Sequence, residues 1–186
     1  MPYIGVLALQ GDFQKHIEAV RACGREAKEV RTPEDLRDCE RLIIPGGEST
    51  TVGILLQKSG LDKAILERAK ENMPIWGTCM GLILLAKEIE GREQWGLKLF
   101  DVRVIRNAYG PQINSFETDI EFRGFQKPFH AVFIRAPIIS KVGKDVEVLA
   151  SHNGHPVAVQ QGTLFGTTFH PELTDDLRIH QFFLSL

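Results

Sequence analysis

The first half of the chain alternates short apolar runs with helical patterns, and this alternation limits the possible folds more than any other feature. The apolar runs YIGVLAL (3–9) and RLII (41–44) each end in a glycine-containing segment, as a buried strand does before a loop. EAKEV (26–30) fits an edge strand and PIW (74–76) a further strand. A β-α-β-α order predicts a mostly parallel sheet covered by helices on both faces, an α/β fold. The helical patterns between the strands lie at 13–23, 32–38, 49–60 and 61–71.

The second half is rich in strand patterns and poor in helical ones. The Asn-Gly pair within HNGH (152–155) is the strongest short signal for a hairpin. Antiparallel hairpins are therefore expected to extend the sheet or to form a second one. TDDLRIHQFFLSL (174–186) predicts a final amphipathic helix with Thr174 as its N-cap. With no linker or repeat, one domain over residues 1–186 is expected. The expected strands lie at 97–106, 115–122, 130–136, 146–151, 156–161 and 164–170.

Charge and cysteine content exclude several classes of function. The 186 residues carry a net charge of -2 without clustered Lys and Arg, so no nucleic-acid surface is expected. No apolar stretch approaches the roughly 20 residues that span a bilayer, and the N-terminus lacks the pattern of a signal peptide. Cys23, Cys39 and Cys79 form no C-x-x-C pair, which argues against a disulfide framework or a structural zinc site. A reduced, cytoplasmic protein is the simplest interpretation.

Cys79 lies in Gly77-Thr78-Cys79-Met80-Gly81, the thiol counterpart of the G-x-S-x-G nucleophile elbow. A sharp strand-to-helix turn strains the nucleophile's backbone, and flanking glycines remove side chains that would clash there. The helix N-terminus beyond the turn favours thiolate, and the N–H of Met80 would face a developing oxyanion. The alternative is a buried structural cysteine, the usual state of a free thiol. Cys23 and Cys39 lack such a context and are interpreted as structural.

His170 is the best candidate for the base that such a cysteine requires. It ends the expected strand LFGTTF, and strand ends are where sites of open α/β sheets assemble. Glu172 follows two residues later, so its carboxylate could orient the imidazole and stabilise the imidazolium. Taken alone, His-Pro-Glu also fits a turn before a helix.

The other five histidines are weaker candidates. His16 lies in a helical pattern among polar neighbours and is expected to be solvated. His152 and His155 have a spacing that could bind metal, but no third ligand is apparent. His130 begins an expected strand and His180 lies in the last helix.

The segment PGGEST (45–50) follows the strand RLII and predicts an anion-binding or oxyanion-binding turn. The adjacent Gly46 and Gly47 leave backbone N–H groups uncovered. It is not a P-loop, because the lysine of that motif is missing. The alternative is a tight turn in which Ser49 caps the next helix.

PGGEST, GTCMGL and HPE, in this order, resemble the class I (triad) glutamine amidotransferases. The similarity extends over GVLALQGD, LIIPGGESTT, GTCMGLILLAKEI, VIRNAYG, FIRAP, VEVLA and FHPELTDD. These segments span nearly the whole chain and resemble the glutaminase subunits of pyridoxal 5′-phosphate synthase.

The resemblance implies a three-layer α/β, flavodoxin-like glutaminase fold that needs no metal or organic cofactor. It implies a nucleophile at Cys79, a general base and acid at His170, and an orienting carboxylate at Glu172. It also implies an oxyanion hole of Met80 and Gly47 N–H groups, and a synthase (lyase) subunit that receives the ammonia and activates the glutaminase by docking. The residues implied to bind L-glutamine are Gly46, Gly47, Glu48, Ser49, Arg106, Ile134 and Arg135.

Two positions depart from the family pattern. The residue after the nucleophile is often small, whereas here it is Met80, whose backbone N–H is unaffected. A histidine often follows FIRAP, whereas here Ile138 stands there.

Three other functions stay open from the sequence. A cysteine peptidase or related hydrolase would share the elbow without needing a glutamine pocket. A non-catalytic regulatory subunit would keep the fold, although Cys79, His170 and Glu172 are all present. A glutaminase could also serve a different synthase.

Overall fold

The computed structural model describes residues 1–106 and 115–186. Helices and strands alternate through the first half, and strands dominate the second half, as the sequence patterns predict. The helices are α1 Phe13–Ala22, α2 Pro33–Leu36, α3 Ser49–Ser59, α4 Leu61–Lys70, α5 Met80–Leu85, the 3-10 helix η1 Pro171–Leu173 and α6 Arg178–Ser185. The strands are β1 Tyr3–Leu7, β2 Ala27–Val30, β3 Cys39–Ile44, β4 Ile75–Thr78, β5 Ala86–Glu90, β6 Phe100–Ile105, β7 Ser115–Ile120, β8 Phe129–Ile134, β9 Ile138–Val142, β10 Glu147–His152, β11 His155–Gln161 and β12 Leu164–Thr167.

The main sheet has seven strands in the order β10-β11-β12-β4-β3-β1-β2. The five strands from β12 to β2 run parallel, whereas β11 and β10 extend the sheet as antiparallel neighbours. Numbered among themselves, the parallel strands have the order 2-1-3-4-5 of flavodoxin-like folds. The α/β fold with antiparallel hairpins in the second half is therefore confirmed.

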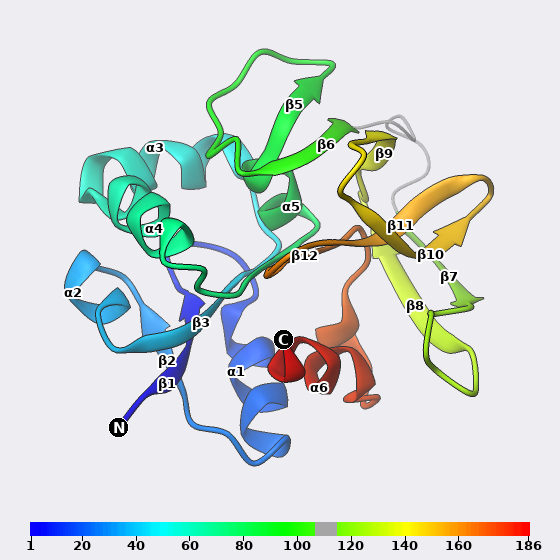
Figure 1. Cartoon of the computed structure of the whole chain (residues 1–186), viewed down its shortest axis with the longest axis horizontal. Coiled ribbons are helices and arrows are strands. Elements are labelled where there is room, and N and C mark those ends of the chain that lie inside the picture. The colour runs from blue at the N-terminus through cyan, green and yellow to red at the C-terminus, as the bar shows by residue number, and fades with distance from the viewer. Residues whose placement is uncertain (107–114) are drawn as a thin grey trace.

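Helices cover both faces of this sheet (Figure 1). Helices α3, α4 and α5 lie on one face, and α1 and α6 lie side by side on the other. Alternate strand residues point to opposite faces. In β4, Ile75 belongs to the same apolar cluster as Val52 and Leu56 of α3, while Trp76 packs with Phe183 of α6. The sheet therefore separates two apolar cores.

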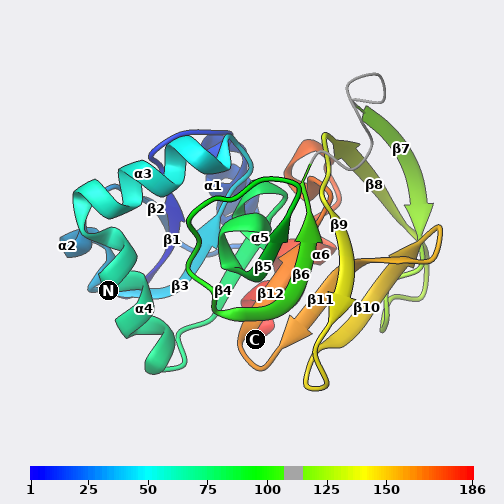
Figure 2. The ribbon, with the colours of Figure 1, turned by 90° about the horizontal axis from the view of Figure 1, so that it is seen from above.

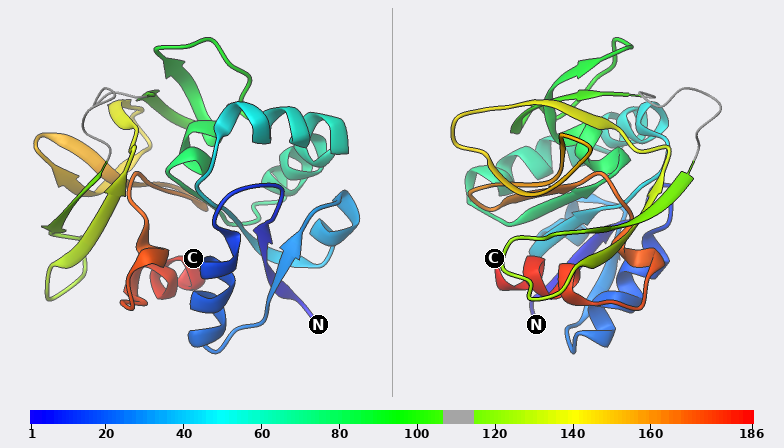
Figure 3. Two further views of the ribbon diagram at one scale, coloured as in Figure 1. Left: turned by 180° about the vertical axis from the view of Figure 1, so that it is seen from behind. Right: turned by 90° about the vertical axis from the view of Figure 1, so that its right-hand side faces the viewer.

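Two small sheets stand beside the main one (Figure 2). One is β5-β6-β9, and the other is the β7-β8 hairpin. Seen from behind, this hairpin lies at the end of the molecule away from the N-terminus (Figure 3). The sequence patterns did not predict β5 or β9. The helix expected beyond the Cys79 turn is present but short, because α5 ends at Leu85 and Ala86–Glu90 pairs with β6.

The last helix is shorter than expected, and Thr174 is not its N-cap. Residues Pro171–Leu173 form η1, and α6 begins only at Arg178. Thr174 instead ends η1, with its hydroxyl donating to the Pro171 carbonyl at 3.0 Å. The chain therefore leaves β12 through a tight turn rather than directly into a helix.

Local turn signals were reliable elsewhere. Asn153 and Gly154 both have positive φ, 49° and 78°, in the β10-β11 hairpin. Thr32 caps α2 with a reciprocal capping box, accepting from the N–H of Asp35 at 3.3 Å.

Within the described residues, no helix is both long and apolar enough to cross a bilayer. The single domain over 1–186 stays a prediction, and the NAYG part of VIRNAYG (107–110) lies outside the described residues.

Candidate active site

Four loops meet at the edge of the main sheet where its parallel strands end. They follow β1, β3, β4 and β12, and they carry Gln10, the PGGEST turn, Cys79 and His170. Carboxyl ends of parallel strands share one edge, so the topology alone brings these distant segments together. The Gln10 side chain accepts a hydrogen bond from the Glu48 N–H at 2.8 Å, which ties the first loop to the second.

The turn at Cys79 has the strained geometry of a nucleophile elbow. Cys79 has φ 49° and ψ -104°, a conformation that a residue with a side chain rarely adopts. The flanking glycines permit it. A Cβ on Gly77 would lie 2.5 Å from the carbonyl carbon of Gly81, and a Cβ on Gly81 would collide with the backbone of Ile44. Close packing of α5 on β3 and β4 therefore fixes this turn.

The Cys79 thiol sits beside the catalytic candidate His170. Cys79 is 7% exposed. Its backbone N–H donates to the Thr167 carbonyl at 2.8 Å, which anchors the elbow to β12. The Sγ atom lies 3.8 Å from the carbonyl oxygen of Ile134, and the thiol is near enough to the His170 imidazole to help raise the pKa of that ring. Met80 is the first residue of α5, so its N–H belongs to the free N-terminus of that helix.

Glu172 holds the far side of the His170 ring. The distance from His170 Nδ1 to Glu172 Oε1 is 2.6 Å. Burial opposes the imidazolium, but hydrogen bonds to Cys79 and Glu172 outweigh it and raise the pKa of His170 to about 10. Burial also opposes the Glu172 carboxylate, yet His16 and His170 lower its pKa overall. The arrangement holds a proton on His170 beside the thiol.

Behind Glu172 lies a feature that the sequence interpretation missed. His16 was expected to be solvated, but its side chain is fully buried because α1 packs that face against α6 and η1. Its Nε2 lies 3.3 Å from Glu172 Oε2, and its Nδ1 lies 3.0 Å from His180 Nε2. The sequence did contain one indication of this burial, because position 16 lies next to the buried Ile17 on the apolar face of the helical pattern.

Glu48 and Arg106 form the other polar part of the site. Glu48 is the N-cap of α3, and its carboxylate accepts from the N–H groups of Thr50 and Thr51 at 3.1 and 2.7 Å. Ser49 is thus the first helical residue and not the cap. Arg106 donates to Glu48 Oε1 at 2.7 Å and to Gln94 Oε1 at 2.6 Å. Burial opposes ionisation of Glu48, but these bonds lower its pKa to about 2.

A pocket of about 280 Å³ opens onto the thiol. Six of the seven residues implied to bind glutamine line it, and Gly46 does not. Gly46 instead packs under His170, where a Cβ would lie 2.6 Å from the ring carbon Cε1. Ile83 also lines the pocket, and Gln10, Thr50 and Gln94 support it from behind; the sequence interpretation singled out none of these four. The full lining is Gly47, Glu48, Ser49, Cys79, Met80, Ile83, Arg106, Ile134, Arg135 and His170.

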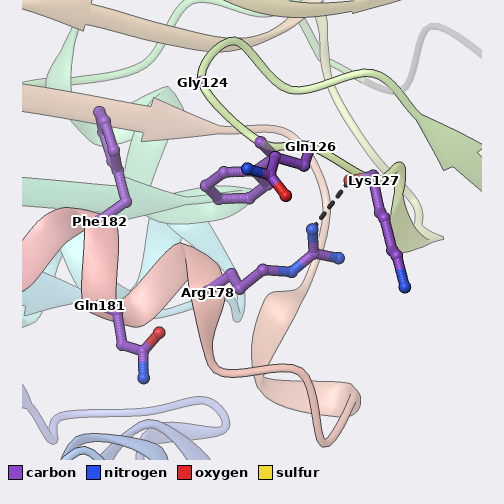
Figure 4. Close-up of a pocket in the computed structure, with 7 residues that line it drawn as sticks. Gly124, Gln126, Lys127, Arg178, Gln181 and Phe182 are labelled. Carbon is purple, nitrogen blue, oxygen red and sulfur yellow. Dashed lines mark hydrogen bonds between the residues drawn. The ribbon is translucent and has the colours of Figure 1, made fainter.

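A larger cavity, of about 580 Å³, lies between α6 and the β7-β8 loop (Figure 4), and Cys79 does not line it. Its one guanidinium, that of Arg178, is held by Asp176 at 2.6 Å and by the Lys127 carbonyl at 2.8 Å. The cavity brings together no nucleophile and base. We therefore place the chemistry in the smaller pocket. Within residues 1–106 and 115–186, no three His, Cys, Asp or Glu side chains are grouped to hold a metal ion.

Comparison with known proteins places this geometry in a family. A chain named pyridoxal 5′-phosphate synthase subunit PdxT from Herpetosiphon aurantiacus is 55% identical, covering 98% of this chain and 99% of that one. The protein of the same name from Mycolicibacterium vanbaalenii is 51% identical, covering 99% and 97%. A crystal structure of a glutamine amidotransferase is 49% identical and superposes with a TM-score of 0.94, covering 98% of this chain and 97% of that one. The family model of the SNO glutamine amidotransferases matches residues 6–186, and the chain belongs to that family.

Proposed function

We propose that this protein hydrolyses L-glutamine to glutamate and ammonia and supplies the ammonia to the synthase (lyase) subunit of a pyridoxal 5′-phosphate synthase. The observation that carries the chemistry is the series Cys79, His170 and Glu172 at one edge of the sheet, opening onto a small pocket whose wall includes charged side chains. The names of the similar chains, pyridoxal 5′-phosphate synthase subunit PdxT, support the partner and the pathway.

The first half of the reaction forms a thioester. The Cys79 thiolate attacks the side-chain amide carbon of glutamine, and the carbonyl oxygen becomes an oxyanion held by the N–H groups of Met80 and Gly47. When the C–N bond breaks, His170 gives its proton to the leaving nitrogen, and ammonia departs. Because the pKa of His170 is raised to about 10, this proton is in place before glutamine arrives.

The second half regenerates the thiolate. Neutral His170 removes a proton from a water molecule as that water attacks the thioester carbon. The C–S bond then breaks, glutamate leaves and Cys79 is again a thiolate beside the His170 imidazolium. Glu172 holds the Nδ1–H throughout and so keeps Nε2 directed at the reacting atoms.

The pocket walls fit the rest of the substrate. Glutamine carries an ammonium and a carboxylate at its far end, and the pocket offers the carboxylate of Glu48 and the guanidinium groups of Arg106 and Arg135. Charged groups of both signs at the wall opposite a nucleophile suit a free amino acid. Gly46 contributes by letting His170 approach, and Ser49 and Ile134 complete the wall.

The direct test mixes the purified chain with the synthase subunit and measures glutamate released from glutamine. We expect release by the wild type in the complex and none above background by Cys79→Ala, while Cys23→Ala is unchanged. Equal rates for Cys79→Ala and wild type would rule out the mechanism. Co-purification identifies the partner and separates this function from a glutaminase of another synthase.

A cysteine hydrolase on a similar fold is the alternative of another class. Labelling of Cys79 by an electrophilic glutamine analogue separates the two, since only a glutaminase would be protected by glutamine.

A cytoplasmic location stays a prediction of the sequence.

A further inference from the structure

A line of buried side chains continues behind the proposed triad. It runs from Cys79 through His170 and Glu172 to His16 on α1 and ends at His180 on α6. The last two histidines touch neither the pocket nor the thiol. Burying two imidazoles in a small domain is costly unless their polar atoms are used, so their role needs an explanation.

The free oxygen of Glu172 requires a donor. Its Oε1 is taken by His170, while Oε2 is buried and has no hydrogen bond of good geometry from any described residue. The nearest polar contact is His16 Nε2, at 3.3 Å. The Thr78 hydroxyl is the other polar neighbour of this nitrogen, at 3.5 Å. A proton on His16 Nε2 faces the closer carboxylate, whereas a lone pair there would leave Glu172 Oε2 without that donor.

The far end of the line favours the same tautomer. If His16 carries its proton on Nε2, its Nδ1 accepts from the Nε2–H of His180 across 3.0 Å. His180 Nδ1, which is buried without a described partner, is then a lone pair. In the opposite tautomer that atom would be an N–H donor buried without an acceptor, the costlier defect.

Aromatic packing keeps both rings in place. Trp76 meets the His16 ring edge-on with centroids 5.3 Å apart, and it meets His180 in the same way at 4.9 Å. The indole N–H is held by Thr167 Oγ1 at 3.1 Å, so the Trp76 ring is itself anchored to β12. Neither imidazole can turn without disturbing the core under the elbow strand β4.

We propose that His16 and His180 are positioning residues, which present the His16 Nε2–H to Glu172 Oε2 and so keep the Glu172 carboxylate ionised and aimed at His170. The proposal rests on the proposed glutaminase function. Both histidines act as neutral rings of one tautomer, and burial lowers the pKa of each, that of His180 to about 3.

Few other charges reach this line. Asp12 at the start of α1 and His170 act on His16, with opposite effects on its pKa. Lys15 and Glu18 of α1 and Asp175 after η1 line a cleft beside Glu172. The His16 and His170 rings and the N–H of Glu172 itself lower the pKa of the Glu172 carboxyl group, so loss of the His16 donor should raise it.

The tautomer is measured without any activity assay. In the ¹⁵N-histidine-labelled chain at pH 7, the His16 and His180 rings should each show a protonated Nε2 and an unprotonated Nδ1. Assignment uses His16→Gln and His180→Gln spectra. A protonated Nδ1 on His16 overturns the proposal, whatever the chain's activity.

Kinetics in the complex with the synthase subunit supply the second test. His16→Leu should lower kcat for glutamate release about 10- to 100-fold with KM within about twofold, the scale of losing a residue that orients a ligand or catalytic group. The acidic limb of its kcat profile should move to higher pH. His16→Gln, which keeps a donor near the Nε2 position, should recover most of the loss, and the exposed His155→Leu should match the wild type.

The outcomes separate two failures. An unchanged kcat and acidic limb in a folded His16→Leu complex overturns the positioning role and leaves the glutaminase function intact. An inactive wild-type complex overturns the glutaminase function, while the tautomer measurement still decides the hydrogen bond. If His16→Leu fails to fold, the same test compares kcat of His16→Gln with kcat of His16→Asn. The Asn amide is too short to reach Glu172, so only His16→Gln should keep most of the wild-type rate.

Discussion

The His170 ring packs directly on Gly46, with a Cβ at position 46 falling 2.6 Å from His170 Cε1. The PGGEST turn (45–50) and the HPE segment (170–172) are far apart in the sequence, yet the glycine of one determines how closely the imidazole of the other can approach. Gly46 has no left-handed backbone conformation, so only the closeness of His170 demands glycine there.

Gly46→Ala is therefore expected to push His170 away from Cys79 while leaving the backbone unstrained. A misplacement of about 1 Å can cost roughly 100-fold in rate, and we expect a fall of that order in kcat for glutamate release in the complex. Steady-state kinetics measure it.

Gly96→Ala is the matched control for this change. Its backbone is also outside the left-handed region, and its nearest neighbour to an added Cβ would be the Leu84 carbonyl at 3.3 Å, away from the pocket. A Gly46→Ala enzyme as active as Gly96→Ala would contradict the role given to this contact.

Glu172→Gln should lower both the activity and the pKa of His170. The neutral amide no longer stabilises the imidazolium, and a buried Gln can present the wrong group to Nδ1, as in triads whose carboxylate is replaced, where rates fall roughly 10⁴-fold. The pKa of His170 should drop well below the wild-type value of about 10. A ring-proton titration by NMR measures it.

The sign of the pH effect on stability follows from that shift. The pKa of His170 is raised on folding, so its stabilising effect is complete below about 6.5 and is lost as pH rises through about 10. The difference in unfolding free energy between wild type and Glu172→Gln should therefore shrink between pH 7 and pH 10. A difference that grows over this range would contradict the assignment.

The sequence predicted most of the parallel sheet and the place of the site. Apolar runs such as RLII indicate strands that are buried on both faces of a sheet. Gly77 and Gly81 indicate close backbone packing around the Cys79 turn, which the structure shows. Loops at the carboxyl ends of parallel strands meet by topology, so Cys79 and His170 could be placed near each other without coordinates.

What the sequence did not predict depends on packing between distant elements. Helix α5 ends at Leu85 because Ala86–Glu90 gains a strand partner in β6, and local periodicity does not record that partner. His16 stands among polar residues, yet α6 arrives from the other end of the chain to bury it. The support of the pocket by Gln10 and Gln94 is likewise a tertiary contact.

Arg106→Lys should weaken glutamine binding more than it slows the chemistry. The guanidinium holds Glu48, Thr50 and Gln94 together at 2.7, 3.0 and 2.6 Å, and an ammonium cannot span three acceptors with this geometry. Losing one charge-assisted hydrogen bond costs about 1.5–3 kcal/mol, which corresponds to a rise in KM of at least about tenfold. Arg103→Lys, on an exposed strand face, is the control, and an unchanged KM for Arg106→Lys would contradict the role.

Glu48→Gln should lower the free energy of unfolding by an amount that depends on pH. The carboxylate caps α3 and pairs with Arg106, and loss of a cap costs about 1 kcal/mol at neutral pH. Because its pKa is depressed on folding, to about 2, the stabilising effect of Glu48 is complete above about pH 4.5 and is lost as pH falls toward 2. Urea unfolding of both proteins should show a gap at pH 7 that closes progressively below pH 4.5. A gap that persists unchanged at pH 2 would mean that packing, and not the charge of Glu48, stabilises this turn.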